Sequence, residues 1–262
     1  MKLSLGFSPC PNDTFIFDAI IHHKIDTEGL TFEVTFDDVE TLNQKAFNNH
    51  LDITKLSYHA YAYAINHYVL LDAGSALGFG VGPLLIAKEA LNVENKDLLV
   101  GIPGKYTTAN FLLSLAYPHL QKKKELVFSD IEQQLLNNQL DLGLIIHENR
   151  FTYADKGLSK WMDLGTYFEE TFNAPIPLGG IIARNDINAN EIAIVDDLIK
   201  QSVEYAFANS YDILPDYVKC HSQEMSEEVM RQHIHLYVND FTMDMGDTGR
   251  KAIEKLVEVY SH

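Results

Sequence analysis

The chain has 262 residues, of which 46% are hydrophobic, enough to bury a core in one large domain or two modest ones. It carries 37 acidic and 20 basic residues, which gives a formal net charge of −17. This acidic balance repels the phosphate backbone, so we expect no nucleic acid among the partners. An anionic ligand would have to be held by local groups, because the overall field opposes it.

The cysteine count and the N-terminus indicate a reducing compartment. Two cysteines, Cys10 and Cys220, are too few for a disulfide framework and predict free thiols. The segment 1–7 lacks the apolar stretch and cleavage site of a secretory signal, and no window reaches the roughly 18 apolar residues of a membrane span. We therefore expect a cytoplasmic protein without a membrane partner.

Strand and helix patterns alternate along the chain, which predicts an α/β protein with mainly parallel sheets. In the first part we expect strands at 3–7, 30–36, 52–54, 69–73 and 84–87 and helices at 14–22, 40–48 and 58–65. In a second unit we expect strands at 98–102, 126–128 and 142–146 and helices at 107–116 and 130–138, the latter capped by Ser129. A strand at 177–183 then returns to the first unit, and helices follow at 192–208, 226–238 and 248–260.

This order of elements divides the chain into a discontinuous lobe I, residues 1–85 and 182–262, and an inserted lobe II, residues 86–181. Two crossings between the lobes predict a cleft and a hinge. The glycine-rich segment 74–83 superficially resembles a dinucleotide-binding fingerprint. No helix pattern follows it within a turn, so we interpret it as a loop or crossover.

Polar side chains follow four of the expected strands, where open parallel sheets bind their ligands. The segments are 8–14, 54–57, 104–108 and 147–150. Two belong to each lobe, and the first three lead into a helix, whose free N–H groups can hold a small anion. A cleft between the lobes would bring all four segments around one ligand.

The first of these segments offers Ser8, Asn12 and Asp13 as candidate binding residues. Two prolines fix its turn, and each denies the backbone a hydrogen-bond donor. Asn12, Asp13 and Thr14 are also good helix N-cap residues, so a well-capped turn without a ligand is the alternative.

His147 is the strongest catalytic candidate among the 11 histidines, because it alone directly follows a buried apolar strand at the carboxyl edge of a sheet. A general base with a pKa near the working pH needs an imidazole in such a place, and Glu148 could orient the ring. We expect His59 to pack among tyrosines, and His233 and His235 to point to different faces of one helix. No cysteine or carboxylate spacing completes a metal site, so no metal is expected.

The other candidates each have a structural alternative. Ser57 and Thr107 can serve only as helix caps, each worth about 1 kcal/mol. Lys55 is either a solvated charge or a contact for an anion, which we favour. Cys10 is either a nucleophile or, as its flanking prolines favour, a packing residue. Arg150 either binds a substrate carboxylate or, as we favour, pairs with an acidic side chain at the surface.

Four segments, in this order, closely resemble the 1,4-dihydroxy-6-naphthoate synthases of the futalosine route to menaquinone. They read SPCPNDTF at 8–15, DITKLS at 52–57, GFGVGP at 78–83 and IIHENR at 145–150. The resemblance runs over essentially the whole chain and implies a two-lobed type II periplasmic-binding-protein-like fold. It also implies a lyase that converts cyclic dehypoxanthinyl futalosine to 1,4-dihydroxy-6-naphthoate without a cofactor.

The same resemblance implies residue roles. His147 corresponds to the proton acceptor. Two substrate-binding segments are implied, made up of Lys55, Leu56, Ser57, Thr107 and Thr108. The substrate is a small carboxylated molecule, which Lys55 and the helix N-termini can hold in spite of the net charge. Closure of the lobes would keep water from the intermediate.

Two alternative functions stay open at this point. Chorismate dehydratase of the same pathway shares the two-lobed fold, but the segment around His147 argues against it. A cytoplasmic protein that binds a small carboxylate without catalysis is the other alternative.

Overall fold

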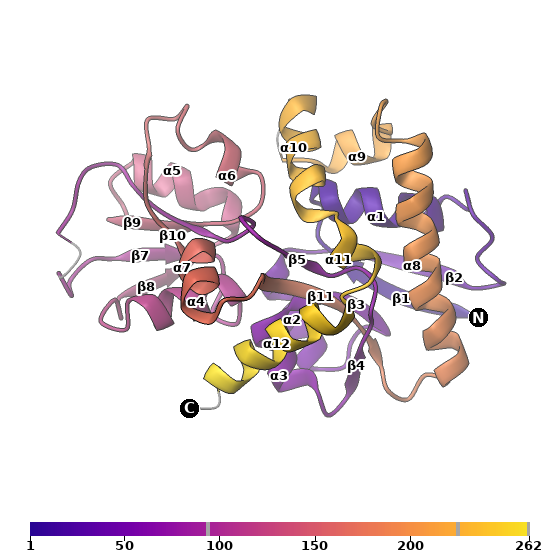
Figure 1. Cartoon of the computed structure of the whole chain (residues 1–262). Helices are drawn as coiled ribbons and strands as arrows, with labels where there is room; N and C mark the ends of the chain where they lie inside the picture. Colours follow the sequence, from indigo (N-terminus) through magenta and orange to yellow (C-terminus); the bar gives the residue numbers. More distant parts are fainter. Residues whose placement is uncertain (93–94, 224–225, 261–262) are drawn as a thin grey trace.

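The structure, a computed structural model, describes residues 1–92, 95–223 and 226–260 (Figure 1). It contains two β-sheets that lie side by side, each flanked by helices. The first sheet is built from the two ends of the chain, and the second from its middle part. In the ranges that the structure describes, no helix is long and apolar enough to cross a membrane.

The first sheet has the strand order β2-β1-β3-β11-β4, with β5 beside β11. Its strands are β1 (Lys2–Phe7), β2 (Thr31–Phe36), β3 (Ile53–Ser57), β4 (Tyr68–Leu70), β5 (Ala76–Gly78) and β11 (Ile176–Arg184). Its helices are α1 (Pro11–Ile21), α2 (Val39–Phe47), α3 (Tyr58–Ala64), α8 (Ala189–Asn209), α9 (Asp216–His221), α10 (Glu227–Tyr237), α11 (Asp240–Met243) and α12 (Gly246–Tyr260). Strand β1 and helices α1 and α8 share one apolar core, which includes Phe7, Phe17 and Leu198.

The second sheet has the strand order β10-β6-β9-β7-β8. Its strands are β6 (Leu84–Ala87), β7 (Val100–Ile102), β8 (Lys123–Glu125), β9 (Leu142–Ile145) and β10 (Ser159–Asp163). The helices of this part are α4 (Thr108–Ala116), α5 (Ile131–Leu136), α6 (Asn149–Thr152) and α7 (Leu164–Phe172), and a 3₁₀ turn, η1, spans Phe128–Asp130.

Both sheets are mixed, which corrects the expectation of mainly parallel sheets. Strand β1 runs parallel to β2 and β3, and β7 runs parallel to β8 and β9. Strand β11 is antiparallel to its three neighbours, and β6 is antiparallel to β9 and β10. All antiparallel pairs in the described part of the chain involve β6, where the chain first enters the second sheet, or β11, where it returns to the first sheet. The alternation of strands and helices in the sequence does not reveal the direction of these two strands.

The expected lobe boundaries at 85/86 and 181/182 fall inside strands. Strand β6 pairs only within the second sheet, and β11 only within the first, among the described residues. We therefore place the crossings in the segments 79–83 and 173–175. At the first crossing Gly82 approaches the backbone of Gly165 so closely that a Cβ on either residue would collide with the other.

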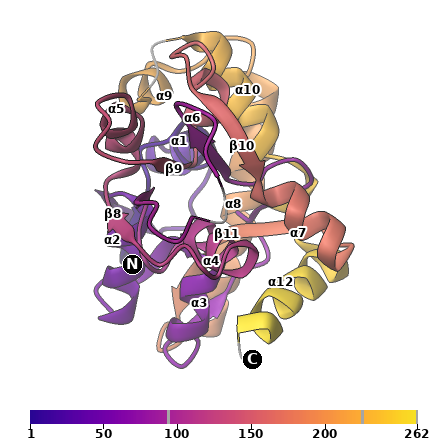
Figure 2. The same ribbon diagram turned by 90° about the vertical axis from the view of Figure 1, so that its left-hand side faces the viewer.

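The two halves of the molecule, each made of one sheet and its helices, also share buried contacts. One apolar cluster includes Tyr58 and Leu77 near the first sheet, Leu85 and Val100 of the second, and Leu256 of α12. Helix α12 packs on α3, and Lys255 Nζ donates a hydrogen bond of 2.7 Å to the carbonyl of Phe172 in α7. Figure 2 shows α12 and α7 near each other on one side of the molecule.

Nearly all expected helices and strands are present, with ends within three residues of the prediction. The strand expected at 126–128 is wrong, because the chain pairs with β7 at 123–125 and η1 begins at Phe128. Ser129 is not a helix cap; its hydroxyl donates to the carboxylate of Asp130, the residue at the N-cap of α5. Six elements were not predicted, namely β5, α6, β10, α7, α9 and α11.

Candidate active site

A pocket of about 90 Å³ receives side chains from both sheets. The end of β3 and the segments that follow β1, β7 and β9 line it, which are the four places where the sequence puts its polar candidates. All nine candidate site residues lie on its wall, namely Ser8, Asn12, Asp13, Lys55, Leu56, Ser57, Thr107, Thr108 and His147. Apolar side chains, among them Leu42, Ile146 and Leu178, fill the space between them, as in most small-molecule sites.

The turn between β1 and α1 differs from the expected cap. Helix α1 begins at Pro11, whose missing N–H is not needed in a first turn, and Cys10 occupies the N-cap position without a side-chain cap. Asn12 and Asp13 therefore belong to the first helical turn, and Thr14 Oγ1 donates to the carbonyl of Cys10 at 3.0 Å. This shift points the Asp13 side chain back to Ser8 instead of to the helix N-terminus.

A buried ion pair forms the floor of this part of the pocket. Lys55 Nζ lies 3.1 Å from Asp13 Oδ1, and both side chains are almost fully buried. Asp13 also accepts hydrogen bonds from Ser8 Oγ at 2.8 Å and from Asn12 Nδ2 at 2.9 Å. Lys55 donates a further bond of 2.9 Å to the carbonyl of Gly74. Lys55 is thus no solvated charge, and its first anionic partner is a carboxylate of the protein itself.

Ser57 ends β3 and occupies the N-cap position of α3 without a side-chain cap. Asn43, which is fully buried, holds it: Ser57 N donates to Asn43 Oδ1 at 2.9 Å, and Asn43 Nδ2 donates to Ser57 Oγ at 3.4 Å. Sequence reasoning missed Asn43, because an amide inside an amphipathic helix gives no sign of the strand it faces.

The two threonines before and at the start of α4 have different tasks. Thr107 is the helix cap, since its Oγ1 accepts from Asn110 N at 3.2 Å and donates to the carbonyl of Gly104 at 2.8 Å. Thr108 Oγ1 donates to the carbonyl of Leu178 in β11 at 2.7 Å. Both hydroxyl protons are therefore engaged within the protein, and each oxygen can offer a lone pair to a ligand.

His147 projects from the segment just after β9, with a left-handed backbone (φ 57°). Its ring packs on Phe128, at 4.7 Å between centroids, and lies 6.1 Å from the ring of His233. Desolvation lowers the pKa of His147 to about 4, so the ring is neutral at pH 7. Its buried Nε2 makes no hydrogen bond to the described part of the chain. A neutral imidazole with a free nitrogen is what a general base requires.

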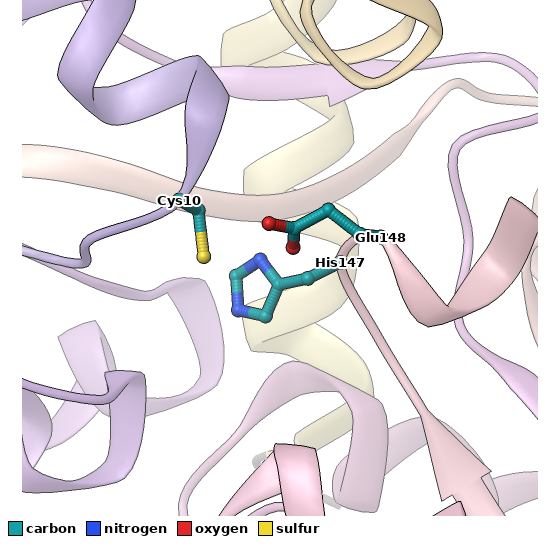
Figure 3. Close-up of side chains that lie close together, drawn as sticks. All are labelled: Cys10, His147 and Glu148. Atoms are coloured by element: carbon teal, nitrogen blue, oxygen red, sulfur yellow. The ribbon is translucent and has the colours of Figure 1, made fainter. Parts of the chain in front are cut away.

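Cys10 and Glu148 lie beside His147 (Figure 3). The thiol, one ring nitrogen and one carboxylate oxygen all lie within 4.8 Å of one another. Cys10 is fully buried, and burial raises the pKa of its thiol well above the usual value, with Glu148 and Asp13 acting in the same direction. A protonated, buried thiol favours the packing interpretation of Cys10 over the nucleophile.

His233, which sequence reasoning did not select, lies behind the pocket wall and contacts two of the lining residues, Asn12 and His147. Its Nε2 lies 2.8 Å from Asn12 Oδ1, and its side chain is fully buried. Because the Asn12 amide nitrogen donates to Asp13, its oxygen must accept, so the proton sits on Nε2 of His233. Burial, reinforced by His147, lowers the pKa of His233 well below its usual value.

A signal for His233 existed in the sequence. The apolar stripe of α10 has the helical spacing i, i+3, i+4 and i+7 and includes this histidine: Met230, His233, Ile234 and Tyr237. A histidine within such a stripe faces the core, whereas His235 points elsewhere. The two histidines thus lie on different faces of α10, as expected, with His233 buried and His235 exposed.

Arg150 does not line the pocket. Its Nη2 lies 3.0 Å from Asp163 Oδ2, and its Nη1 donates to the carbonyl of Gly82. The interpretation of Arg150 as the partner of an acidic side chain is confirmed. The pair is mostly buried, however, and joins α6 to β10 and to the first crossing.

A two-sheet α/β fold with a pocket between the halves is that of the periplasmic binding proteins. The periplasmic aliphatic sulphonate binding protein of Escherichia coli has this fold with a TM-score of 0.66 at 11% identity, covering 99% of this chain and 88% of that one. The ligand-binding component of an ABC-type import system from Staphylococcus aureus has a TM-score of 0.71 at 12% identity, covering 100% and 92%. The predicted fold class is confirmed.

The chain belongs to the menaquinone biosynthesis family, whose model matches residues 3–262. The 1,4-dihydroxy-6-naphthoate synthase of Thermus thermophilus is 45% identical over 254 residues, 97% of this chain and 92% of that protein. The enzyme of the same name from Streptomyces coelicolor is 39% identical over 260 residues, 97% and 91% of the two chains. A crystal structure from Archaeoglobus fulgidus matches with a TM-score of 0.94 at 35% identity, covering 99% and 97%. The prediction of an enzyme is confirmed, and the non-catalytic alternative is set aside.

Proposed function

We propose that the protein is a cytoplasmic lyase that converts cyclic dehypoxanthinyl futalosine to 1,4-dihydroxy-6-naphthoate in menaquinone biosynthesis, with His147 as the general base. Similarity to two synthases over nearly the whole chain supports the substrate. The observation that carries the role of His147 is its buried Nε2, which belongs to a neutral ring on the pocket wall and has no hydrogen bond to the described residues.

The pocket offers suitable groups for a carboxylated, hydroxylated ring system. Lys55 has three N–H donors, and two of them are directed to Asp13 and to the carbonyl of Gly74, so the third can reach the substrate carboxylate. The oxygens of Thr107 and Thr108 can accept from substrate hydroxyls, since their own protons are engaged. Leu56 and its apolar neighbours would pack against the rings.

In the proposed reaction, His147 removes a proton next to the spiro centre of the substrate. The electron pair left behind opens the ring by elimination, a carbon–carbon bond breaks, and the sugar-derived fragment leaves. Formation of the aromatic naphthoate supplies the driving force. The apolar walls and the closure of the two halves would exclude water during these steps.

Replacement of His147 by Asn tests the proposal. Asn accepts the left-handed backbone of this position, so the variant should fold, bind substrate and lose turnover by at least about 100-fold. Turnover is read by mass spectrometry of the naphthoate formed, and binding by calorimetry. His23→Asn is the matched control, because His23 is exposed and has a similar φ of 51°; it should keep full activity.

Two outcomes would contradict the proposal. One is a wild-type protein that forms no naphthoate under conditions in which the Thermus thermophilus enzyme does. The other is a His147→Asn variant with wild-type turnover. A parallel assay with chorismate distinguishes the synthase from the alternative dehydratase. A dehydratase would consume chorismate and leave the futalosine derivative intact.

A further inference from the structure

Three side chains of metal-binding type meet next to the pocket. Cys10 Sγ, a ring nitrogen of His147 and a carboxylate oxygen of Glu148 lie within 4.8 Å of one another. Figure 3 shows the thiol on the turn before α1 and the other two side chains on the segment after β9, all pointing to a common centre. Cys10 is far in the sequence from the adjacent pair His147 and Glu148, so no motif spacing reveals the cluster.

The donor set defines the class of cation. A thiolate, an imidazole and a carboxylate are the ligands of zinc, whereas magnesium and calcium prefer oxygen alone. Around a tetrahedral zinc ion these donor atoms lie roughly 3.5 Å apart, given bonds of about 2.0 to 2.3 Å. A cation at the centre of the cluster would therefore draw the three donor atoms closer together than they are now.

Of the three side chains, His147 is the one that lines the pocket. Cys10 is 0% exposed and Glu148 1%, so both are held inside the protein, while His147 lines the pocket. A cation would therefore approach the cluster from the pocket, on the side of His147. The net charge of −17 favours a cation over an anion there.

We propose that Cys10, His147 and Glu148 form a binding site for a thiophilic divalent cation such as Zn²⁺. On binding, the cation replaces the thiol proton of Cys10, which is released to solvent, and accepts a lone pair from His147 and one from Glu148. The site uses no residue of β3 or α4, which line other parts of the pocket wall.

A cation bound at this site would prevent His147 from acting as the general base. A neutral imidazole has one free lone pair, so when one nitrogen binds the cation, the other must carry the proton. The ring then has no nitrogen left to accept a proton from the substrate, and the cation acts as a reversible inhibitor. This consequence rests on the proposed function, but the binding of the cation does not.

Cobalt absorption tests binding independently of activity. The chelator-treated full chain is titrated with Co²⁺, which gives a thiolate charge-transfer band in the near ultraviolet only when sulfur is a ligand. The titration is run in a Cys220→Ser background, because the exposed Cys220 lies 3.1 Å from His221 Nδ1 and could bind cobalt on its own. We expect one equivalent of Co²⁺, displaced by Zn²⁺, with the band abolished by adding Cys10→Ser.

Glu148→Gln provides a second variant in case Cys10→Ser fails to fold. It should keep the band but weaken cation affinity by at least about tenfold. A band that is absent in the Cys220→Ser protein, or that survives Cys10→Ser, would overturn the proposal, as would wild-type affinity in Glu148→Gln. In the naphthoate assay, Zn²⁺ should inhibit the wild type and Cys220→Ser equally, and a chelator should restore both. Binding without inhibition would leave the cation site intact and contradict the role of His147 as base.

Discussion

At the scale of single residues, the properties of His147 come from its neighbours as much as from its own ring. The left-handed backbone turns the side chain from the end of β9 into the pocket, and Phe128 and His233 pack around it. His233 is in turn fixed by Asn12, which is fixed by Asp13. The ring is thus desolvated and oriented by a chain of contacts that begins at the Lys55–Asp13 pair.

The acidic limb of the pH profile should report this desolvation. Burial lowers the pKa of His147 to about 4, so the base form persists well below pH 6.5. We expect kcat/KM to stay constant from pH 7.5 down to about pH 5.5 and to reach half its maximum near pH 4. The pH dependence of substrate binding to His147→Asn serves as the control, since it contains every ionisation of substrate and pocket except that of His147. A half-maximum near 6.5 would mean that the imidazole is solvated.

Sequence reasoning at this scale succeeded where a residue follows an apolar strand and failed where two distant side chains pair. His147, Ser57 and Thr107 were selected because each stands at the end of a strand or the start of a helix. Asn43 and His233 were not, since their roles exist only through partners on other elements. Position along a strand is local information, and pairing across the fold is not.

At the scale of elements, the pair of Lys55 and Asp13 joins β3 to the first turn of α1. The strand and helix are also neighbours through β1, which pairs with β3 directly before the turn. Both side chains are buried, so water cannot stabilise either charge. Each charge therefore depends on the other, and on the hydrogen bonds of Ser8, Asn12 and Gly74.

Removing one member of this pair should destabilise the protein more than removing both. Lys55→Met leaves the carboxylate of Asp13 buried without its cation, and we expect a loss of about 3 kcal/mol in the free energy of unfolding in urea. Adding Asp13→Asn to Lys55→Met should recover part of that loss, because no charge is then buried. Losses that simply add up in the double variant would show that the two groups do not interact.

Elements were predictable where their residues follow a regular period. Most amphipathic helices and the apolar central strands were found, although α7 was missed, and the charged edge strand β8 was placed three residues too late. Edge strands carry charges that suppress the apolar pattern. Strand β10 was missed because its pairing with β6 shifts between Lys160 and Met162, which breaks the alternation of side chains.

At the scale of the whole molecule, the two halves touch at the pocket through a few specific contacts. Glu40 of α2 accepts a hydrogen bond of 2.9 Å from the backbone N of Tyr106, just before α4. Thr108 reaches the carbonyl of Leu178 in β11. The sequence indicated two crossings and a cleft, but it placed both boundaries inside strands. Which sheet β6 and β11 join is decided by pairing partners far away in the chain.

Gly104 makes the contact at Glu40 possible, and replacing it should loosen the junction of the two halves. Its φ is 142°, and a Cβ there would lie 2.5 Å from the Cβ of Glu40. Gly104→Ala therefore adds a clash between the halves to the strain of its backbone. We expect faster hydrogen exchange at the Tyr106 amide and a higher KM with substrate.

Gly157→Ala is the matched control for this prediction. Gly157 also has a positive φ, of 78°, but a Cβ there would meet no atom within 4 Å. It should cost only local strain, about 1 kcal/mol, and leave exchange at Tyr106 and KM unchanged. If both variants change KM alike, backbone strain explains the effect and the contact with Glu40 does not control how the halves meet. If Gly104→Ala alone raises KM, substrate binding depends on the close approach of the loop before α4 to α2, as expected for a pocket assembled from both halves.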